Sequence, residues 1–152
     1  MFKSAALAIA ILVLLGSIGV IAAADDDDDV AAAMKALDEF MAAFNARDMD
    51  TWAKTLNYPH VRIASGTVRV WESPEDYAGR DVFSMLTSQY GWDHSVWDKR
   101  EVVQSGKDKV HFATTFSRYD KDGNKIATFD SLYIVTKRDG HWGTQARSSF
   151  AP

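Results

Sequence analysis

The sequence contains no cysteine, which excludes disulfide bonds, thiolate metal sites and a cysteine nucleophile. It also lacks a strong excess of either charge. The formal net charge is −4, so the chain has no basic footprint for nucleic acid, and we expect no nucleic-acid partner. Aromatic side chains make up 12% of the residues, which is typical of a globular domain that relies on its core.

Several motifs that carry chemistry are missing as well. The sequence has no G-x-G-x-x-G or P-loop pattern, so we expect no nucleotide cofactor. No serine stands in a G-x-S-x-G context, which leaves a serine hydrolase unsupported. The four histidines show no H-x-H, H-x-x-x-H or H-E-x-x-H spacing. The sequence therefore predicts neither a metal site nor a cofactor.

The first 24 residues have the pattern of a secretory signal peptide. Lys3 supplies the positive charge, residues 5–21 are almost wholly apolar, and three alanines precede a cleavage site after Ala24. The alternative is a retained anchor, because the apolar run is about 18 residues long, near the minimum that spans a bilayer. In both cases the domain lies outside the cytoplasm. We expect a periplasmic or secreted protein with no membrane contact after cleavage.

An acidic run at residues 25–29 follows the leader. These adjacent carboxylates could bind calcium, but they repel one another and stay solvated, and before a helix they suit the positive end of its dipole. The sequence thus predicts a signal peptide (1–24), an acidic linker (25–29) and one domain (30–152).

The domain begins with helices and continues as strands. Apolar side chains recur along residues 30–47 at the spacing of one buried helical face. A short helix should end at Thr55, and a third should run from Ser73 to Tyr90. Strands are expected at 60–64, 67–71, 95–104, 109–119, 125–137 and 141–150.

Three stretches carry a resemblance to a known superfamily: 37–48 followed by Trp52, the Tyr-Pro-His-Val of 58–61, and 137–142, where an Asp-Gly hairpin leads to a Trp. With the element order, they resemble the nuclear transport factor 2-like (cystatin-like, SnoaL-like) superfamily over essentially all of 30–150. The resemblance implies an α+β fold in which a bent antiparallel sheet wraps around a long N-terminal helix to form a cone. It also implies a homodimer formed through the sheet. Members include isomerases, dehydratases, cyclases and non-enzymatic binding modules, so activity stays open.

Asp130 is the first candidate for chemistry. It alternates along its strand with apolar side chains that a covered sheet would bury, namely Ile126, Leu132 and Ile134, together with Thr128. Inside the cone, burial would raise the pKa of this carboxyl group and suit it to proton transfer. Ketosteroid isomerases and SnoaL-like cyclases, which the chain resembles in pattern, use an interior Asp in that manner, although no extended motif here matches theirs. The alternative is an Asp paired with an arginine or placed at the sheet rim.

His60 and Arg147 complete the catalytic candidates. His60 could act as a general base or a substrate hydrogen-bond partner, or its ring could cap nearby backbone groups. Arg147 could bind an anionic group, or neutralise Asp130 or Glu101. An aromatic set is most simply part of the core: Trp52, Tyr58, Tyr90, Phe112, Phe116 and Trp142. Part of it could instead line an apolar pocket, and the candidates for that lining are Trp52, Tyr58, Tyr90, Phe112 and Trp142.

Two functions compete on this basis. The first is a non-catalytic pocket or interaction module for a small apolar or amphipathic ligand. The second is a cofactor-free isomerase, cyclase or dehydratase with Asp130 as general acid or base. A structural partner of another protein is a third alternative. Convergence of Asp130, His60 and Arg147 on one cavity would favour the enzyme.

Overall fold

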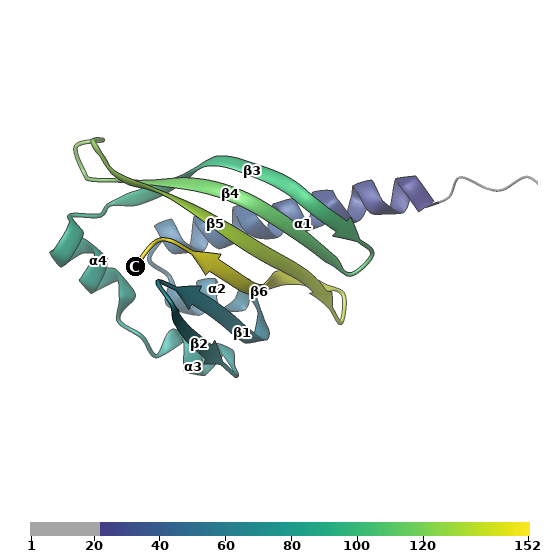
Figure 1. Ribbon diagram of the computed structural model, residues 1–152. Helices are drawn as coiled ribbons and strands as arrows, with labels where there is room; N and C mark the ends of the chain where they lie inside the picture. Colours follow the sequence, from purple (N-terminus) through teal and green to yellow (C-terminus); the bar gives the residue numbers. More distant parts are fainter. Residues whose placement is uncertain (1–21) are drawn as a thin grey trace, which may run out of the picture.

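The computed structural model describes residues 22–152 (Figure 1). Its helices are α1 (Ala22–Asn45), α2 (Met49–Lys54), α3 (Pro74–Ala78) and α4 (Val82–Tyr90). Its strands are β1 (Leu56–Ala64), β2 (Thr67–Trp71), β3 (His94–Gly106), β4 (Lys109–Tyr119), β5 (Lys125–Arg138) and β6 (His141–Ser149). No helix in this part of the chain combines the length and the apolarity needed to cross a bilayer.

The strands form one six-stranded sheet in the order β2-β1-β6-β5-β4-β3. All neighbours are antiparallel except β1 and β6, which run parallel. The long strands β3, β4 and β5 curve over α1, which lies along their concave side (Figure 1). The predicted α+β fold, a bent sheet around a long N-terminal helix, is confirmed.

The buried stripe of α1 holds the sheet in this curve. Ala33, Leu37 and Phe40 are at most 3% exposed, as their spacing predicts. The Asn45 side chain fixes the end of the helix, because its amide donates to the Ser95 carbonyl at 2.8 Å and accepts from the Ser95 amide at 2.9 Å. The buried face of α1 and the two hydrogen bonds of Asn45 thus dock α1 onto β3.

The N-terminal end of α1 differs from the prediction. The helix begins at Ala22, so the acidic run 25–29 belongs to its first turns and is not a linker. Asp29 there lies 3.3 Å from the ammonium group of Lys137 on β5. This ion pair joins the first turns of α1 to β5. Residues 1–21 lie outside the described part of the chain, so the cleavage of the leader stays a prediction.

The predicted third helix is in fact two helices. Ser73 caps α3 as expected, since its hydroxyl accepts from the Asp76 amide at 3.2 Å. Gly79 then ends α3, and Asp81 caps α4 by accepting from the Ser84 amide at 3.3 Å. The sequence pattern missed this second cap because both segments share an apolar stripe. The break between the helices directs Arg80 toward the interior of the cone.

Candidate functional site

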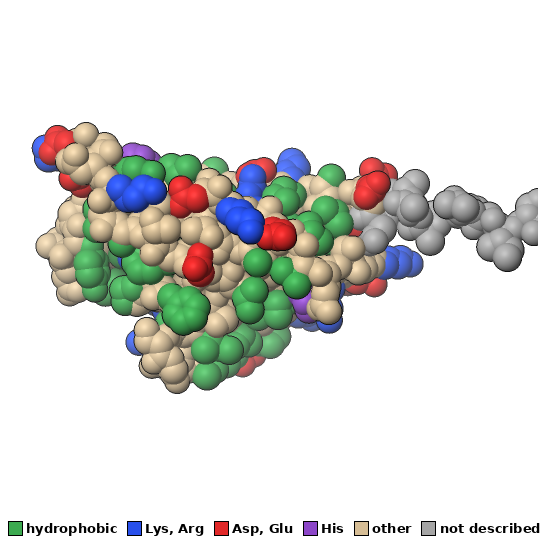
Figure 2. Space-filling model, turned by 45° about the horizontal axis from the view of Figure 1, so that its top comes forward, with side chains coloured by type: hydrophobic (Ala, Val, Ile, Leu, Met, Phe, Trp, Pro, Cys, Tyr) green, Lys and Arg blue, Asp and Glu red, His purple; other side chains and the backbone are tan. Residues whose placement is uncertain are grey.

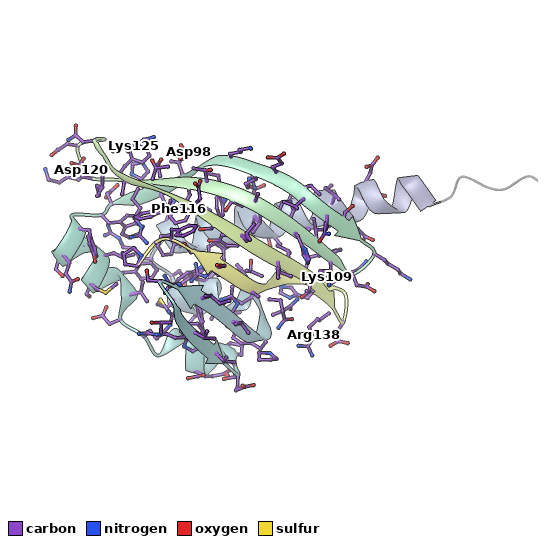
Figure 3. The ribbon with its side chains drawn as sticks, in the orientation of Figure 1. Asp98, Lys109, Phe116, Asp120, Lys125 and Arg138 are labelled. Atoms are coloured by element: carbon purple, nitrogen blue, oxygen red, sulfur yellow. The ribbon has the colours of Figure 1, made fainter. Side chains whose placement is uncertain are left out.

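A pocket of about 440 Å³ lies on the concave side of the sheet, between α1 and the strands. Aromatic side chains form part of its lining. The Phe40 ring from α1 contacts the rings of Trp52 (5.4 Å between centroids) and Tyr133 (5.7 Å), and the Phe44 ring lies 4.9 Å from that of Trp52. Phe116 of β4 also borders the pocket (Figure 3). A cavity of this volume and lining suits a small organic molecule.

The lining of the pocket is also cationic. Five arginines line the pocket: Arg62, Arg69, Arg80, Arg118 and Arg147. Among the described residues, no Asp or Glu lies within 4.0 Å of any of these guanidinium groups. Of the acidic residues within 22–152, only Asp81 lines the pocket. It is exposed and caps α4. This cationic lining therefore carries positive charge that no Asp or Glu of the described residues neutralises.

Burial and mutual repulsion act on these arginines. Burial, followed by the nearby charge of Arg147, lowers the pKa of Arg62 to about 10. The pKa of Arg118 is lowered by the same two causes, with burial the larger. Burial also lowers the pKa of Arg80. Holding Arg62, Arg80 and Arg118 in their charged forms therefore costs the fold free energy. Arg147 differs, because burial opposes its charged form but Tyr77 and Tyr133 outweigh burial and raise its pKa.

Arg147 occupies the centre of this cluster. Its Nη2 donates to the Tyr77 hydroxyl at 3.2 Å, and its guanidinium carbon lies 5.3 Å from the Phe40 ring and 5.6 Å from the Trp52 ring. Its buried Nε has no hydrogen-bond partner among the described residues. The predicted neutralisation by Asp130 or Glu101 is therefore wrong. The other prediction for Arg147, that it could bind an anionic group, remains.

Arg118 and Arg62 reach the pocket from β4 and β1. The guanidinium of Arg118 lies 5.0 Å from the Phe129 ring, and within the described chain its buried Nε also has no partner. Arg62 donates through Nη2 to the carbonyl oxygens of Ala151 (3.0 Å) and Pro152 (2.9 Å). Arg62 is thus partly satisfied by the backbone, whereas Arg118 contacts the rings of Phe116 and Phe129.

Asp130 lies on the outer face of the sheet, so the prediction that it faces the interior is wrong. Its carboxylate is exposed and accepts a hydrogen bond from the Thr115 hydroxyl at 2.8 Å. Both stripes of β5 are rather apolar, so alternation alone could not choose the inner one. The stripe with Tyr133 and Val135 faces inward because its larger side chains pack on α1.

His60 is a structural residue of the core. Its ring is fully buried, stacks on Trp71 and meets Tyr77 edge-on. Its Nδ1 lies 2.9 Å from the Thr144 carbonyl oxygen, which can only accept, so Nδ1 carries the proton. Burial, followed by the charge of Arg147, lowers the pKa of His60 to about 3. His60 does not line the pocket. The structure therefore agrees with the ring capping a backbone group.

Of the five aromatic side chains expected in a pocket, Trp52 lines it and the others do not. Phe112 is fully buried in the core, and the Tyr58 hydroxyl donates to a carbonyl of α2. Tyr90 is exposed on α4, and Trp142 packs under Lys137 on β5. No three His, Cys, Asp or Glu side chains of the described residues cluster as metal ligands.

The fold and the site define an α+β cone with a pocket lined by aromatic and arginine side chains. The family model for the NTF2-like protein (DUF6841) family matches residues 27–146, so the chain belongs to this family. No curated protein matches it.

Solved structures show the same fold in distant relatives. A cystatin-like protein of unknown function from Nostoc punctiforme is 13% identical, with a TM-score of 0.65 over 80% of this chain and 90% of its own. A ketosteroid isomerase-like protein from Erwinia carotovora atroseptica is 20% identical, with a TM-score of 0.59 over 83% and 99%. An NTF2-like protein of unknown function from Shewanella oneidensis is 14% identical, with a TM-score of 0.56 over 82% and 98%. At these identities the likeness concerns the fold alone.

Proposed function

We propose that this protein is an exported, non-catalytic module that binds a small amphipathic ligand inside the cone. The observation that carries the proposal is the pocket of about 440 Å³, whose lining combines aromatic side chains with guanidinium groups. Such a cavity can bury the apolar body of a ligand while it orients a polar end.

The alternative, an acid–base enzyme, needs a proton donor or acceptor at the pocket. The similarity in fold to the ketosteroid isomerase-like protein from Erwinia carotovora atroseptica is the reason to consider this alternative. Yet Asp130 lies outside the cone, His60 does not reach the pocket, and the exposed Asp81 is engaged as a helix cap. No histidine and no unengaged carboxylate of the described residues lines the pocket, which favours the binding module.

The test uses a neutral, polarity-sensitive probe, N-phenyl-1-naphthylamine, whose fluorescence rises in apolar surroundings. Two neighbouring residues of β2 provide a matched pair of variants. Thr67 is exposed and lines the pocket, so it stands at the rim, whereas Val68 is exposed and does not line it. Thr67→Trp should obstruct the pocket, and Val68→Trp should leave it open.

We expect saturable binding of one probe per chain, with affinity reduced about ten-fold or more by Thr67→Trp and unchanged by Val68→Trp. Asp130→Asn should also leave binding unchanged, because this carboxylate lies on the outer face. Equal effects of Thr67→Trp and Val68→Trp, or an absence of saturable binding, would contradict the proposal.

A homodimer through the sheet stays a prediction, and the outer face is where a second copy would pack. Figure 2 shows apolar side chains exposed between charged ones over the sheet. The strand register places Val68, Ile63, Ser148 and Leu132 in one row across β2, β1, β6 and β5. Three of these four side chains are apolar and at least 43% exposed.

A further inference from the structure

The inner face of the sheet places like charges side by side. Arg62 on β1 and Arg147 on β6 are direct partners in the parallel strand pair, and Arg118 reaches the same pocket from β4. Like charges in facing positions destabilise a sheet. Since no Asp or Glu of the described residues pairs with these three side chains, a bound anion would relieve the repulsion.

Two of these side chains also hold buried donors that nothing in the described chain satisfies, the Nε of Arg118 and the Nε of Arg147. Native folds rarely leave such groups unpaired. The rings of Phe40 and Phe129 stabilise the positive charges from their faces, but a ring offers no strong acceptor for these N–H groups. A carboxylate supplies two acceptor oxygens in the plane that suits a guanidinium.

We propose that the ligand is an amphipathic organic acid whose carboxylate binds to Arg147 and Arg118. This inference rests on the proposed function of the pocket and names the chemical class of its ligand. Arg62 adds positive charge, but two backbone carbonyls already accept its hydrogen bonds. The apolar body of the acid packs beside these guanidinium groups on the aromatic side chains of the lining, which include Phe40, Phe44 and Trp52.

The experiment compares two probes of nearly the same shape by isothermal titration calorimetry. 2-Naphthoate carries the carboxylate, and 2-naphthamide replaces it with an uncharged amide. The wild-type protein should bind the acid about ten-fold or more tightly than the amide, because only the acid forms charge-assisted hydrogen bonds with the guanidinium groups.

Arg118→Met and Arg147→Met are the two test variants, and Arg138→Met is the control. Arg138 is exposed at the end of β5 and does not line the pocket (Figure 3). Each test variant should lower the affinity for 2-naphthoate about ten-fold or more and leave that for 2-naphthamide nearly unchanged. The control should alter neither. If Arg147→Met does not fold, because Tyr77 loses its partner, Arg118→Met still decides the question.

The outcomes separate the two proposals. Equal affinity for the acid and the amide would overturn the anion inference and leave the pocket function intact. Tighter binding of the acid that neither Arg118→Met nor Arg147→Met weakens would also overturn it, since the carboxylate would then bind elsewhere. If neither probe binds and N-phenyl-1-naphthylamine also fails, the pocket function itself falls.

Discussion

Replacing Leu37 with alanine should lower the free energy of unfolding by about 2–5 kcal/mol. Leu37 is fully buried on the stripe of α1 that the sheet wraps, and its carbonyl accepts from the Trp97 indole at 3.2 Å. The truncation leaves a cavity between α1 and β3, where close packing gives the surroundings little freedom to collapse. Denaturant unfolding monitored by circular dichroism measures the change.

Glu39→Ala on the same helix is the matched control. Glu39 is exposed and pairs only with Lys35 one turn away, so its removal should change stability by about 0.5 kcal/mol or less. A cost that small for Leu37→Ala as well would mean that the helical stripe does not hold the sheet in its curve.

Acid should destabilise this protein through His60. In the folded chain its pKa lies at about 3, against 6.5 for the unperturbed side chain. Between these two pH values His60 is protonated in the unfolded state and neutral in the folded state. Lowering the pH therefore favours unfolding. The stabilisation is complete above pH 6.5 and declines by roughly 1 kcal/mol per pH unit toward pH 3, several kcal/mol in all.

His60→Asn isolates this contribution. The asparagine amide can still donate to the Thr144 carbonyl oxygen, but it does not titrate. We expect the variant to be less stable at neutral pH and to show a shallower loss of stability between pH 6.5 and 4. Identical pH slopes for the two proteins, or an NMR titration in which the His60 ring protonates near pH 6.5 while the chain stays folded, would refute this account.

Much of the fold follows from patterns that depend only on local sequence. The spacing of Leu37 and Phe40 identified the buried face of α1, and the Asp139-Gly140 turn identified the hairpin between β5 and β6. Strand β4 was predicted with its exact bounds. These features were readable because helical periodicity and tight-turn residues reflect backbone geometry directly.

Local sequence does not determine which face of β5 points toward the helix. Side chains alternate between the two faces of a strand, so Asp130 and Tyr133 lie on opposite faces of β5. The alternation does not say which of these faces meets the helix. That choice depends on which side chains fill the space under the sheet, and this is a property of the assembled core. The catalytic role suggested for Asp130 depended on the wrong choice of face.

The arginine lining of the pocket was not predicted, although the sequence pattern of β4 indicates one of its residues. On β4, Arg118 continues the alternation of Val110, Phe112 and Phe116, all of which are buried. Arg118 is thus a charged residue within an apolar stripe, as Asp130 is on β5. The side-by-side placement of Arg62 and Arg147 had no such signal, because it arises from the parallel pairing of β1 with β6.

The most direct test of a cationic binding pocket is a two-dimensional ¹H–¹⁵N NMR spectrum of the arginine Nε–Hε groups during titration with 2-naphthoate. The Nε groups of Arg118 and Arg147 are buried and, within the described chain, unpaired, so carboxylate binding should shift both signals in parallel with saturation. The signal of the exposed Arg138 should stay in place. Saturable binding that leaves the Arg118 and Arg147 signals unmoved would contradict the account.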